Sequence, residues 1–65
     1  MTSYVDVPFV GGTLDGQTHS VPRLEDGSLP EEVHGPRGQV YVRKASREAL
    51  GRGGWEYQDL RYELR

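Results

Sequence analysis

The feature that most constrains the fold of this sequence is a glycine-rich bend at residues 11–16, which reads Gly-Gly-Thr-Leu-Asp-Gly. Glycine reaches positive φ without strain from a Cβ atom, and Asp before Gly tolerates the left-handed region. The apolar residues before the bend recur at period two, and residues 17–21 after it are also extended in character. The sequence therefore predicts a β-hairpin. The residues predicted to form its structural turn are Gly11, Gly12, Asp15 and Gly16.

The length of the chain limits the core that it can form. At 65 residues, we expect a single small β domain over residues 1–65, with residues 1–3 frayed. A chain this short buries only about 60% of its unfolded surface. It has no cysteine, which excludes disulfides and thiolate zinc sites. No apolar run is long enough for a signal peptide or a membrane span, so we expect a cytoplasmic protein.

Residues 4–10 alternate as a β-strand does, with apolar side chains at the odd positions on one face. Pro8 has no N–H to donate to a neighbouring strand, which favours a position at the edge of a sheet. After the bend, residues 17–21 predict a weaker and more polar strand.

Residues 23–38 have the least regular pattern, because they contain two prolines and three glycines. We expect a long irregular connection whose Leu24, Leu29 and Val33 cover one side of a small sheet. Residues 29–33 also fit a single helical turn with proline at its first position.

The most regular strand pattern lies at residues 39–43. Valine is favoured on the half-buried surface of a sheet, so we expect Val40 and Val42 to face inward. Tyr41 and Arg43 then face outward.

Residues 45–50 predict a short helix of one to two turns. Ser46 suits the N-cap position and Gly51 suits the residue that ends the helix. A helix this short does not persist on its own, so we expect Leu50 to hold it by packing inward.

A second glycine-rich bend at residues 51–54 leads into an aromatic strand that contains Trp55 and Tyr57. Beyond it the apolar positions change from odd to even numbers. We expect residues 58–65 to continue as a strand with a bulge. A terminal helical turn is the alternative, because the apolar spacing there also fits three and four residues.

Together these patterns predict a mainly β fold. It is a small twisted antiparallel sheet or open barrel of three or four strands with one short helix. The predicted core consists of Val5, Val7, Phe9, Val21, Leu24, Leu29, Val40, Val42, Leu50, Trp55, Tyr57 and Leu60.

Charge is distributed unevenly along the chain, although the net charge is only −2. Residues 1–36 have a balance of −5, residues 37–52 a balance of +4, and the remainder −1. Such asymmetry can steer an acidic partner to the second half or favour self-association. An ordinary solvated surface is the alternative, because exposed ion pairs contribute little.

The sequence does not indicate a catalytic or cofactor site. His19 and His34 lack the spacing of zinc ligands, so we expect no metal. Neither Ser20 nor Ser46 lies in a nucleophile-turn sequence, and so small a chain has no room for a deep pocket with paired carboxylates. The two glycine-rich bends lack the Lys-Ser/Thr pair of a P-loop. We therefore expect no catalytic residues, no cofactor and no small-molecule substrate.

The residues best suited to bind a partner lie in and after the basic segment 37–52. Nucleic-acid binders combine a cationic groove with exposed aromatic side chains, but the negative net charge argues against that function. An edge strand, a thin core and uneven charge favour contact with another protein or with a second copy. The predicted partner-binding residues are Tyr41, Arg43, Lys44, Arg47, Arg52, Trp55 and Tyr57.

Four segments resemble one group of proteins: residues 9–17, residues 21–22, residues 40–43 and residues 54–57. The group comprises short, mostly uncharacterised proteins of actinobacterial phages and their hosts, with a Gly-Gly-x-x-Asp-Gly hairpin and a C-terminal Trp-x-Tyr strand. Thr13 stands where that pattern usually has proline. The resemblance implies a phage accessory protein, either a host-directed binder or a minor virion component. We therefore expect the protein either in the cytoplasm of the host cell or associated with the virion.

We therefore expect a non-enzymatic protein-interaction module that binds another protein or itself and has no membrane contact. A nucleic-acid-binding module that uses segment 37–52 and the nearby aromatic residues is the alternative. Oligonucleotide binding that weakens with salt would distinguish the second from the first.

Overall fold

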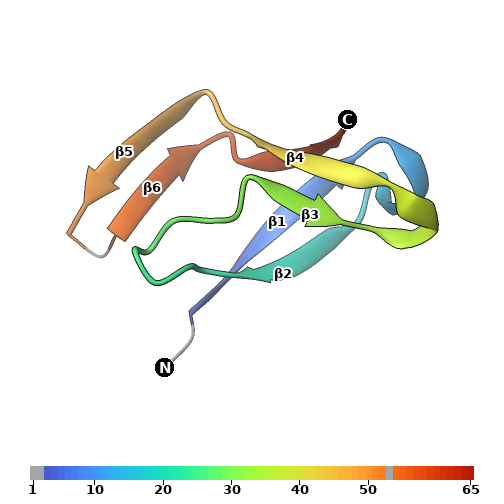
Figure 1. The fold of residues 1–65 in the computed structure, drawn as a ribbon. Coiled ribbons are helices and arrows are strands. Elements are labelled where there is room, and N and C mark those ends of the chain that lie inside the picture. The colour runs from blue at the N-terminus through green and yellow to red at the C-terminus, as the bar shows by residue number, and fades with distance from the viewer. Residues whose placement is uncertain (1–2, 53) are drawn as a thin grey trace.

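The structure, a computed structural model, describes residues 3–52 and 54–65. Its strands are β1 (Tyr4–Val10), β2 (Thr18–Pro22), β3 (Glu32–His34), β4 (Val40–Lys44), β5 (Arg47–Gly51), β6 (Gly54–Gln58) and β7 (Arg61–Leu64). Two 3-10 turns are η1 (Gly12–Leu14) and η2 (Pro36–Gly38). Five strands form a sheet in the order β2-β1-β7-β4-β3, which curls into a half-barrel. β5 and β6 form a separate hairpin that projects from this sheet (Figure 1).

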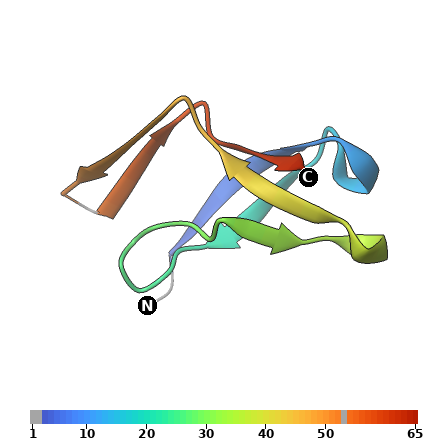
Figure 2. The same cartoon turned by 45° about the horizontal axis from the view of Figure 1, so that its top comes forward.

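The predicted fold class is confirmed in its main feature, because the molecule is mainly β. The prediction of three or four strands and one short helix is wrong, since the described residues form seven strands and only 3-10 turns. A turned view shows the β5–β6 hairpin standing away from the curled sheet (Figure 2). Within residues 3–52 and 54–65, no helix has the length and hydrophobicity needed to cross a membrane.

The predicted hairpin at the first glycine-rich bend is confirmed, because β1 and β2 pair antiparallel along their lengths. At the end of the pair, Phe9 N donates to Gln17 O (2.8 Å) and Gly16 N donates to Phe9 O (3.0 Å). Gly16 and Gln17 thus both oppose Phe9, which is the arrangement of a G1 bulge. Gly16 has the left-handed φ of 80° that this bulge requires.

Asp15 stabilises the bend in a different way from the one predicted. Its φ is −52°, which is not left-handed, and positive φ values fall instead on Gly11 and Gly12. The Asp15 carboxylate accepts a hydrogen bond from Gly11 N (2.7 Å). The aspartate therefore closes the bend through its side chain.

The prediction that Pro8 places β1 at a sheet edge is wrong. β1 lies between β2 and β7, and the edges are β2 and β3. Pairing with β7 begins only at Phe9, opposite Tyr62. Phe9 N points to β2, and successive N–H groups along a strand point in alternate directions. The nitrogen of Pro8, which carries no hydrogen, therefore points to the β7 side. No hydrogen bond is lost there, because the pairing of β1 with β7 begins only at the next residue.

The 23–38 connection is more ordered than predicted, because it contains β3 and η2. Residues 29–33 are not a helical turn, since Glu32–His34 pairs antiparallel with β4. Of the residues expected to cover the sheet, Leu29 is buried and Val33 is half-buried, but Leu24 is 51% exposed.

The predicted helix over residues 45–50 is wrong, because β5 occupies this segment and pairs along its whole length with β6. A helix of one to two turns leaves most of its backbone groups without internal partners, whereas the β-ladder satisfies them. Ser46 is not an N-cap, and its N–H donates to Gln58 O (2.9 Å). Leu50, expected to face inward, is 70% exposed.

β4 confirms the strand predicted at residues 39–43, but the side chains predicted to face inward and outward are exchanged. Tyr41 is fully buried, while Val40 and Val42 are half-buried on the other face. The Tyr41 hydroxyl donates to Gly11 O (2.8 Å) and accepts from Leu14 N (3.1 Å). Its polar atom is therefore satisfied inside the protein.

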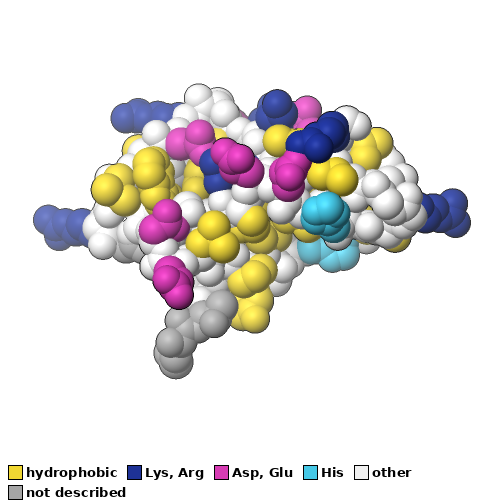
Figure 3. All heavy atoms as spheres, viewed as in Figure 1, with side chains coloured by type: hydrophobic (Ala, Val, Ile, Leu, Met, Phe, Trp, Pro, Cys, Tyr) yellow, Lys and Arg dark blue, Asp and Glu magenta, His cyan; other side chains and the backbone are white. Residues whose placement is uncertain are grey.

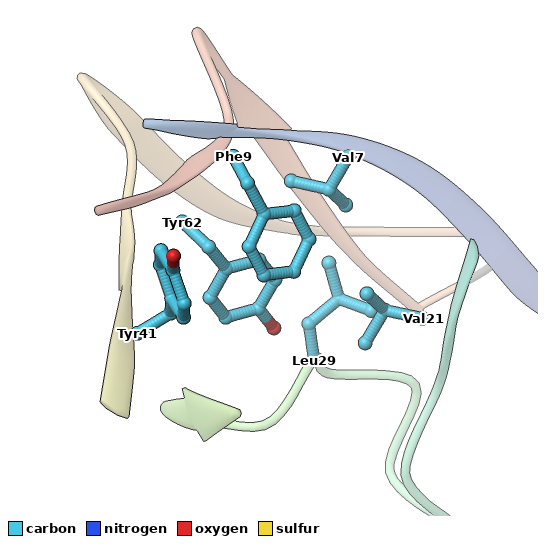
Figure 4. Packing of buried hydrophobic residues seen from close by; sticks show 6 residues of the cluster. All are labelled: Val7, Phe9, Val21, Leu29, Tyr41 and Tyr62. Atoms are coloured by element: carbon cyan, nitrogen blue, oxygen red, sulfur yellow. The ribbon is translucent and has the colours of Figure 1, made fainter. Parts of the chain in front are cut away.

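The core lies within the curl of the sheet, with Phe9 stacked on Tyr62 and in edge contact with Tyr41 (Figure 4). Leu29 enters this cluster from the connection. The buried residues are Val7, Phe9, Val21, Leu29, Tyr41 and Tyr62. Four of these confirm the predicted core, whereas Tyr41 and Tyr62 lie outside the predicted set. Leu24 and Leu50 are wrongly included in it, because both are more than half exposed.

The aromatic strand predicted after the second bend is confirmed as β6, and residues 61–64 are strand rather than helix. The apolar residues change from odd to even positions because β6 and β7 are separate strands, and not because one strand contains a bulge. Asp59 has a φ of 54° and lies where the chain passes from one sheet to the other. Gly53 of the second bend, and residues 1–2 of the segment predicted to fray, lie outside the described residues.

Candidate functional site

The two faces of the β5–β6 hairpin differ in chemistry. Residues opposite each other in an antiparallel pair share a face. The register places Glu48 opposite Tyr57 and Leu50 opposite Trp55. One face therefore carries two aromatic rings, a leucine and a carboxylate, and it turns toward the 24–31 part of the connection.

Polar contacts hold the hairpin against the connection. Arg23 Nη1 donates to Gly27 O (2.6 Å) and to Trp55 O (3.0 Å), which joins the connection to β6. Leu29 N donates to the Tyr57 hydroxyl (3.1 Å). These contacts fix the distance between the two segments.

The space between the hairpin and the connection is a groove of about 320 Å³, which we call the hairpin groove. Its apolar residues are Leu24, Leu29, Trp55 and Tyr57. Its polar residues are Asp26, Ser28, Glu31, Arg43 and Glu48. Figure 3 shows hydrophobic and acidic side chains next to one another over this side of the molecule.

Arg43 is a structural cation of the hairpin groove. Its Nη1 donates to Leu29 O, its Nη2 lies 2.9 Å from Glu48 Oε1, and its guanidinium lies 5.2 Å from the centre of the Tyr57 ring. The side chain is only 17% exposed. Charge-assisted and cation–π contacts of this kind join β4, β5, β6 and the connection.

Asp26 remains anionic at the rim of the groove. Ser28 Oγ (2.5 Å) and Ser28 N (2.9 Å) both donate to its Oδ1. These bonds, the side-chain bond first, lower the pKa of the Asp26 carboxyl below its usual value. Because both donors are neutral, the negative charge of Asp26 is not cancelled.

Large apolar side chains are exposed around the groove. Leu24 is 51% exposed and Leu50, which shares the face of half-buried Trp55, is 70% exposed. A chain with a six-residue core gains stability from every apolar side chain that it buries. Tyr4, Val10 and Leu64 are also exposed, but Leu24 and Leu50 adjoin a groove, where a partner side chain can bury them.

The hairpin groove unites only part of the predicted partner-binding set, namely Arg43, Trp55 and Tyr57. Tyr41 is in the core and is not accessible. Lys44 follows Arg43 in β4 and so points to the opposite face, and Arg47 lies on the opposite face of the hairpin from Glu48. Arg52 follows β5 at the hairpin end. The basic segment therefore does not form one cationic surface.

Sequence reasoning missed six groove residues: Leu24, Asp26, Ser28, Leu29, Glu31 and Glu48. Glu48 had a usable signal, because two glycines with two residues between them, Gly51 and Gly54, fit a two-residue hairpin loop. Reading a strand before that loop would have placed Glu48 beside Tyr57. The sequence contains no comparable signal for Glu31.

A second hollow, of about 450 Å³, lies between the edge strands β2 and β3. Phe9, Val21 and Val33 are among its apolar residues, and His19 and His34 come from opposite strands. The His19 ring contacts Phe9 edge-on, with centroids 5.4 Å apart. In the described part of the chain, no group of three or more His, Cys, Asp or Glu residues could hold a metal ion.

A family described as a domain of unknown function (DUF8847) matches residues 5–61 of the chain. The matched segment includes every residue of the hairpin groove. No curated protein and no solved structure matches the chain.

Proposed function

We propose that this chain, which belongs to the DUF8847 family, is a non-enzymatic protein-interaction module that binds its partner at the hairpin groove. The observation that carries this proposal is the exposure of Leu24, which lines the groove, and of Leu50, which pairs with the groove residue Trp55 across the hairpin. Burying a fully exposed leucine contributes about 1.5–3 kcal/mol, and Leu24 and Leu50, which are 51% and 70% exposed, would each contribute the corresponding fraction at an interface. Trp55, a half-buried aromatic residue of the groove, is of the residue type most often found as an interface anchor.

The biological setting that we propose is a phage accessory protein, acting either on a host protein or as a minor virion component. Its support is the resemblance of the glycine hairpin and the Trp-x-Tyr strand to short proteins of actinobacterial phages and their hosts. A cytoplasmic or virion-associated location goes with that setting.

The experiment compares two double variants of the full chain. Leu24→Ser with Leu50→Ser removes the apolar rim of the groove, and Tyr4→Ser with Val10→Ser is the matched control, because these residues are also exposed (63% and 46%) but lie on β1. Immobilised proteins are exposed to an actinobacterial lysate, and captured proteins are quantified and then titrated in purified form. We expect the groove variant to lose about tenfold or more in affinity.

The control variant should bind as the wild type does, and both variants should keep the wild-type melting temperature to within a few degrees. Equal binding by all three proteins would contradict a partner site at the groove. Sedimentation of the wild type over a concentration range identifies a second copy as the partner. Salt-sensitive oligonucleotide binding that is lost in Lys44→Ala with Arg52→Ala would instead favour a nucleic-acid-binding function.

A further inference from the structure

We propose that the hairpin groove recognises a lysine or arginine side chain of its partner, flanked by an apolar residue. This inference rests on the proposed function and adds the chemistry of the partner. Three observations support it: the charge of the groove, the arrangement of its aromatic rings, and an internal arginine that already occupies part of it.

The groove has an excess of negative charge. Its charged residues are three carboxylates, Asp26, Glu31 and Glu48, and one guanidinium, Arg43. Beside the groove, the Arg23 guanidinium donates to Gly27 O and Trp55 O, so three carboxylates face two guanidinium groups and the local net charge is −1. A cationic partner side chain therefore meets a favourable field, and an anionic one meets an unfavourable field.

Arg43 does not offset this preference, because its guanidinium is committed. It donates to Leu29 O, pairs with Glu48 and lies over Tyr57. An anionic ligand would have to compete with these contacts within the protein. In the described residues the Glu31 carboxylate forms no ion pair and is exposed, so it is available to a partner cation.

Arg43 also shows the arrangement that a partner cation would adopt. Its guanidinium combines an aromatic face, Tyr57, with a carboxylate, Glu48. The groove also contains a second aromatic ring, Trp55, and a second carboxylate, Glu31, with which a partner cation can make contacts of the same two kinds. Trp is the most favourable ring for a cation–π contact.

The apolar part of the groove fits the rest of such a side chain. Lysine and arginine carry aliphatic stems that pack on apolar surface while the charged end stays near water. Leu24 and Trp55 provide that surface, and the exposed Leu50 next to Trp55 can cover an apolar neighbour in the partner sequence.

The test uses Trp55 as the reporter, because it is the only tryptophan of the chain. The probe is the blocked peptide acetyl-Ala-Arg-Leu-Ala-amide, titrated against wild-type protein and followed by Trp55 emission and the indole N–H resonance. The same peptide with citrulline replaces the guanidinium by a neutral group of the same shape. A third peptide carries glutamate at that position.

We expect saturable millimolar binding of the arginine peptide, binding about two- to fivefold weaker for the citrulline peptide, and none for the glutamate peptide. Glu31→Gln should weaken the arginine peptide about two- to fivefold. The matched control is Glu32→Gln, which makes the same charge change at the neighbouring residue. Glu32 lines the other hollow and pairs with Arg65, so this variant should bind as the wild type does.

Equal affinity for the arginine and citrulline peptides, or no response of Trp55, would overturn the inference. So would equal weakening by Glu31→Gln and Glu32→Gln, because the effect would then be one of overall charge. If groove-dependent partner capture persists without any preference for arginine, the interaction module stands and only the cation preference fails. If capture does not depend on the groove, the proposed function itself fails.

Discussion

At the scale of single residues, buried tyrosines supply both core volume and the contacts that hold the loops. The Tyr62 hydroxyl donates to Pro30 O in the connection (2.8 Å). The Tyr41 hydroxyl bonds to Gly11 and Leu14 in the first bend. Each of these two rings fills core volume while its hydroxyl bonds to a loop backbone. A core of only six buried residues can therefore also order loops that have few apolar side chains of their own.

Gly16 should be intolerant of a β-branched side chain. Its φ is 80°, and a Cβ atom there would have nothing within 4 Å, so any cost comes from the backbone and not from a clash. We expect Gly16→Val to lower the free energy of unfolding by about 1–3 kcal/mol, measured by urea unfolding. Gly16→Asn is the control, because asparagine tolerates the left-handed region, and it should cost clearly less. Equal losses would exclude backbone strain as the cause.

The turn at the glycine-rich bend could be predicted from the sequence, whereas the burial of Tyr41 could not. A glycine before a polar extended segment signals a turn through its own conformational freedom. The burial of Tyr41 depends on hydroxyl partners 30 and 27 residues away, Gly11 and Leu14. Only the folded chain brings these groups together. The alternation of residues in the sequence therefore led to the wrong prediction that Val40 and Val42 face inward.

At the scale of elements, β5 shows how a partner strand decides between two local structures. Residues 45–50 include the helix formers Ala, Arg, Glu and Leu, but an isolated helix of this length is marginal in water. β6 contains Trp and Tyr, which favour strands, and its backbone pairs with every residue of β5. Of the groove, β6 was predicted, and the Glu48 side could have been found only by weighing the Gly51–Gly54 hairpin signal above the helix propensity of residues 45–50.

The close approach of two glycines should set the position of the hairpin. Gly54 has a φ of 117°, and a Cβ atom there would lie 3.2 Å from Gly27 Cα. Backbone cannot move aside as a flexible side chain can, so Gly54→Ala should push the hairpin away from the connection. We expect Trp55 emission at longer wavelength and faster hydrogen exchange of Leu29 N–H, the donor to Tyr57.

Gly51, which pairs with Gly54 across the hairpin, provides the control. The atoms nearest to a Cβ atom at Gly51 would be those of the Glu56 side chain, which can rotate away. Gly51→Ala should therefore leave the emission of Trp55 and the exchange of Leu29 close to those of the wild type. Similar shifts in both variants would mean that the contact with Gly27 does not position the hairpin.

At the scale of the whole molecule, the last strand completes the sheet. β7 lies between β1 and β4, parallel to the first and antiparallel to the second. Local patterns identify strands but carry little information on which strand returns to the centre of a sheet. The strand order was therefore not predictable, and neither was the burial of Tyr62, which follows from β7 lying beside Phe9.

Alkaline pH should destabilise the molecule through Tyr62. Burial raises the pKa of Tyr62 to about 12, whereas a tyrosine in the unfolded chain has a pKa of about 10. The unfolded state thus loses its proton first. The contribution of this group to stability is fully present below about pH 10 and is lost as the pH rises toward 12.

Tyr62→Phe isolates this effect from the ionisation of other groups. The variant lacks the hydrogen bond to Pro30 O, so near neutral pH we expect it to be about 1 kcal/mol less stable than the wild type. As the pH rises above about 10, the wild type loses stability that the variant keeps, and the difference between them should narrow. Urea unfolding at a series of alkaline pH values measures this difference. A stability difference that stays constant over this pH range would mean that the Tyr62 hydroxyl ionises in the folded state as readily as in the unfolded chain.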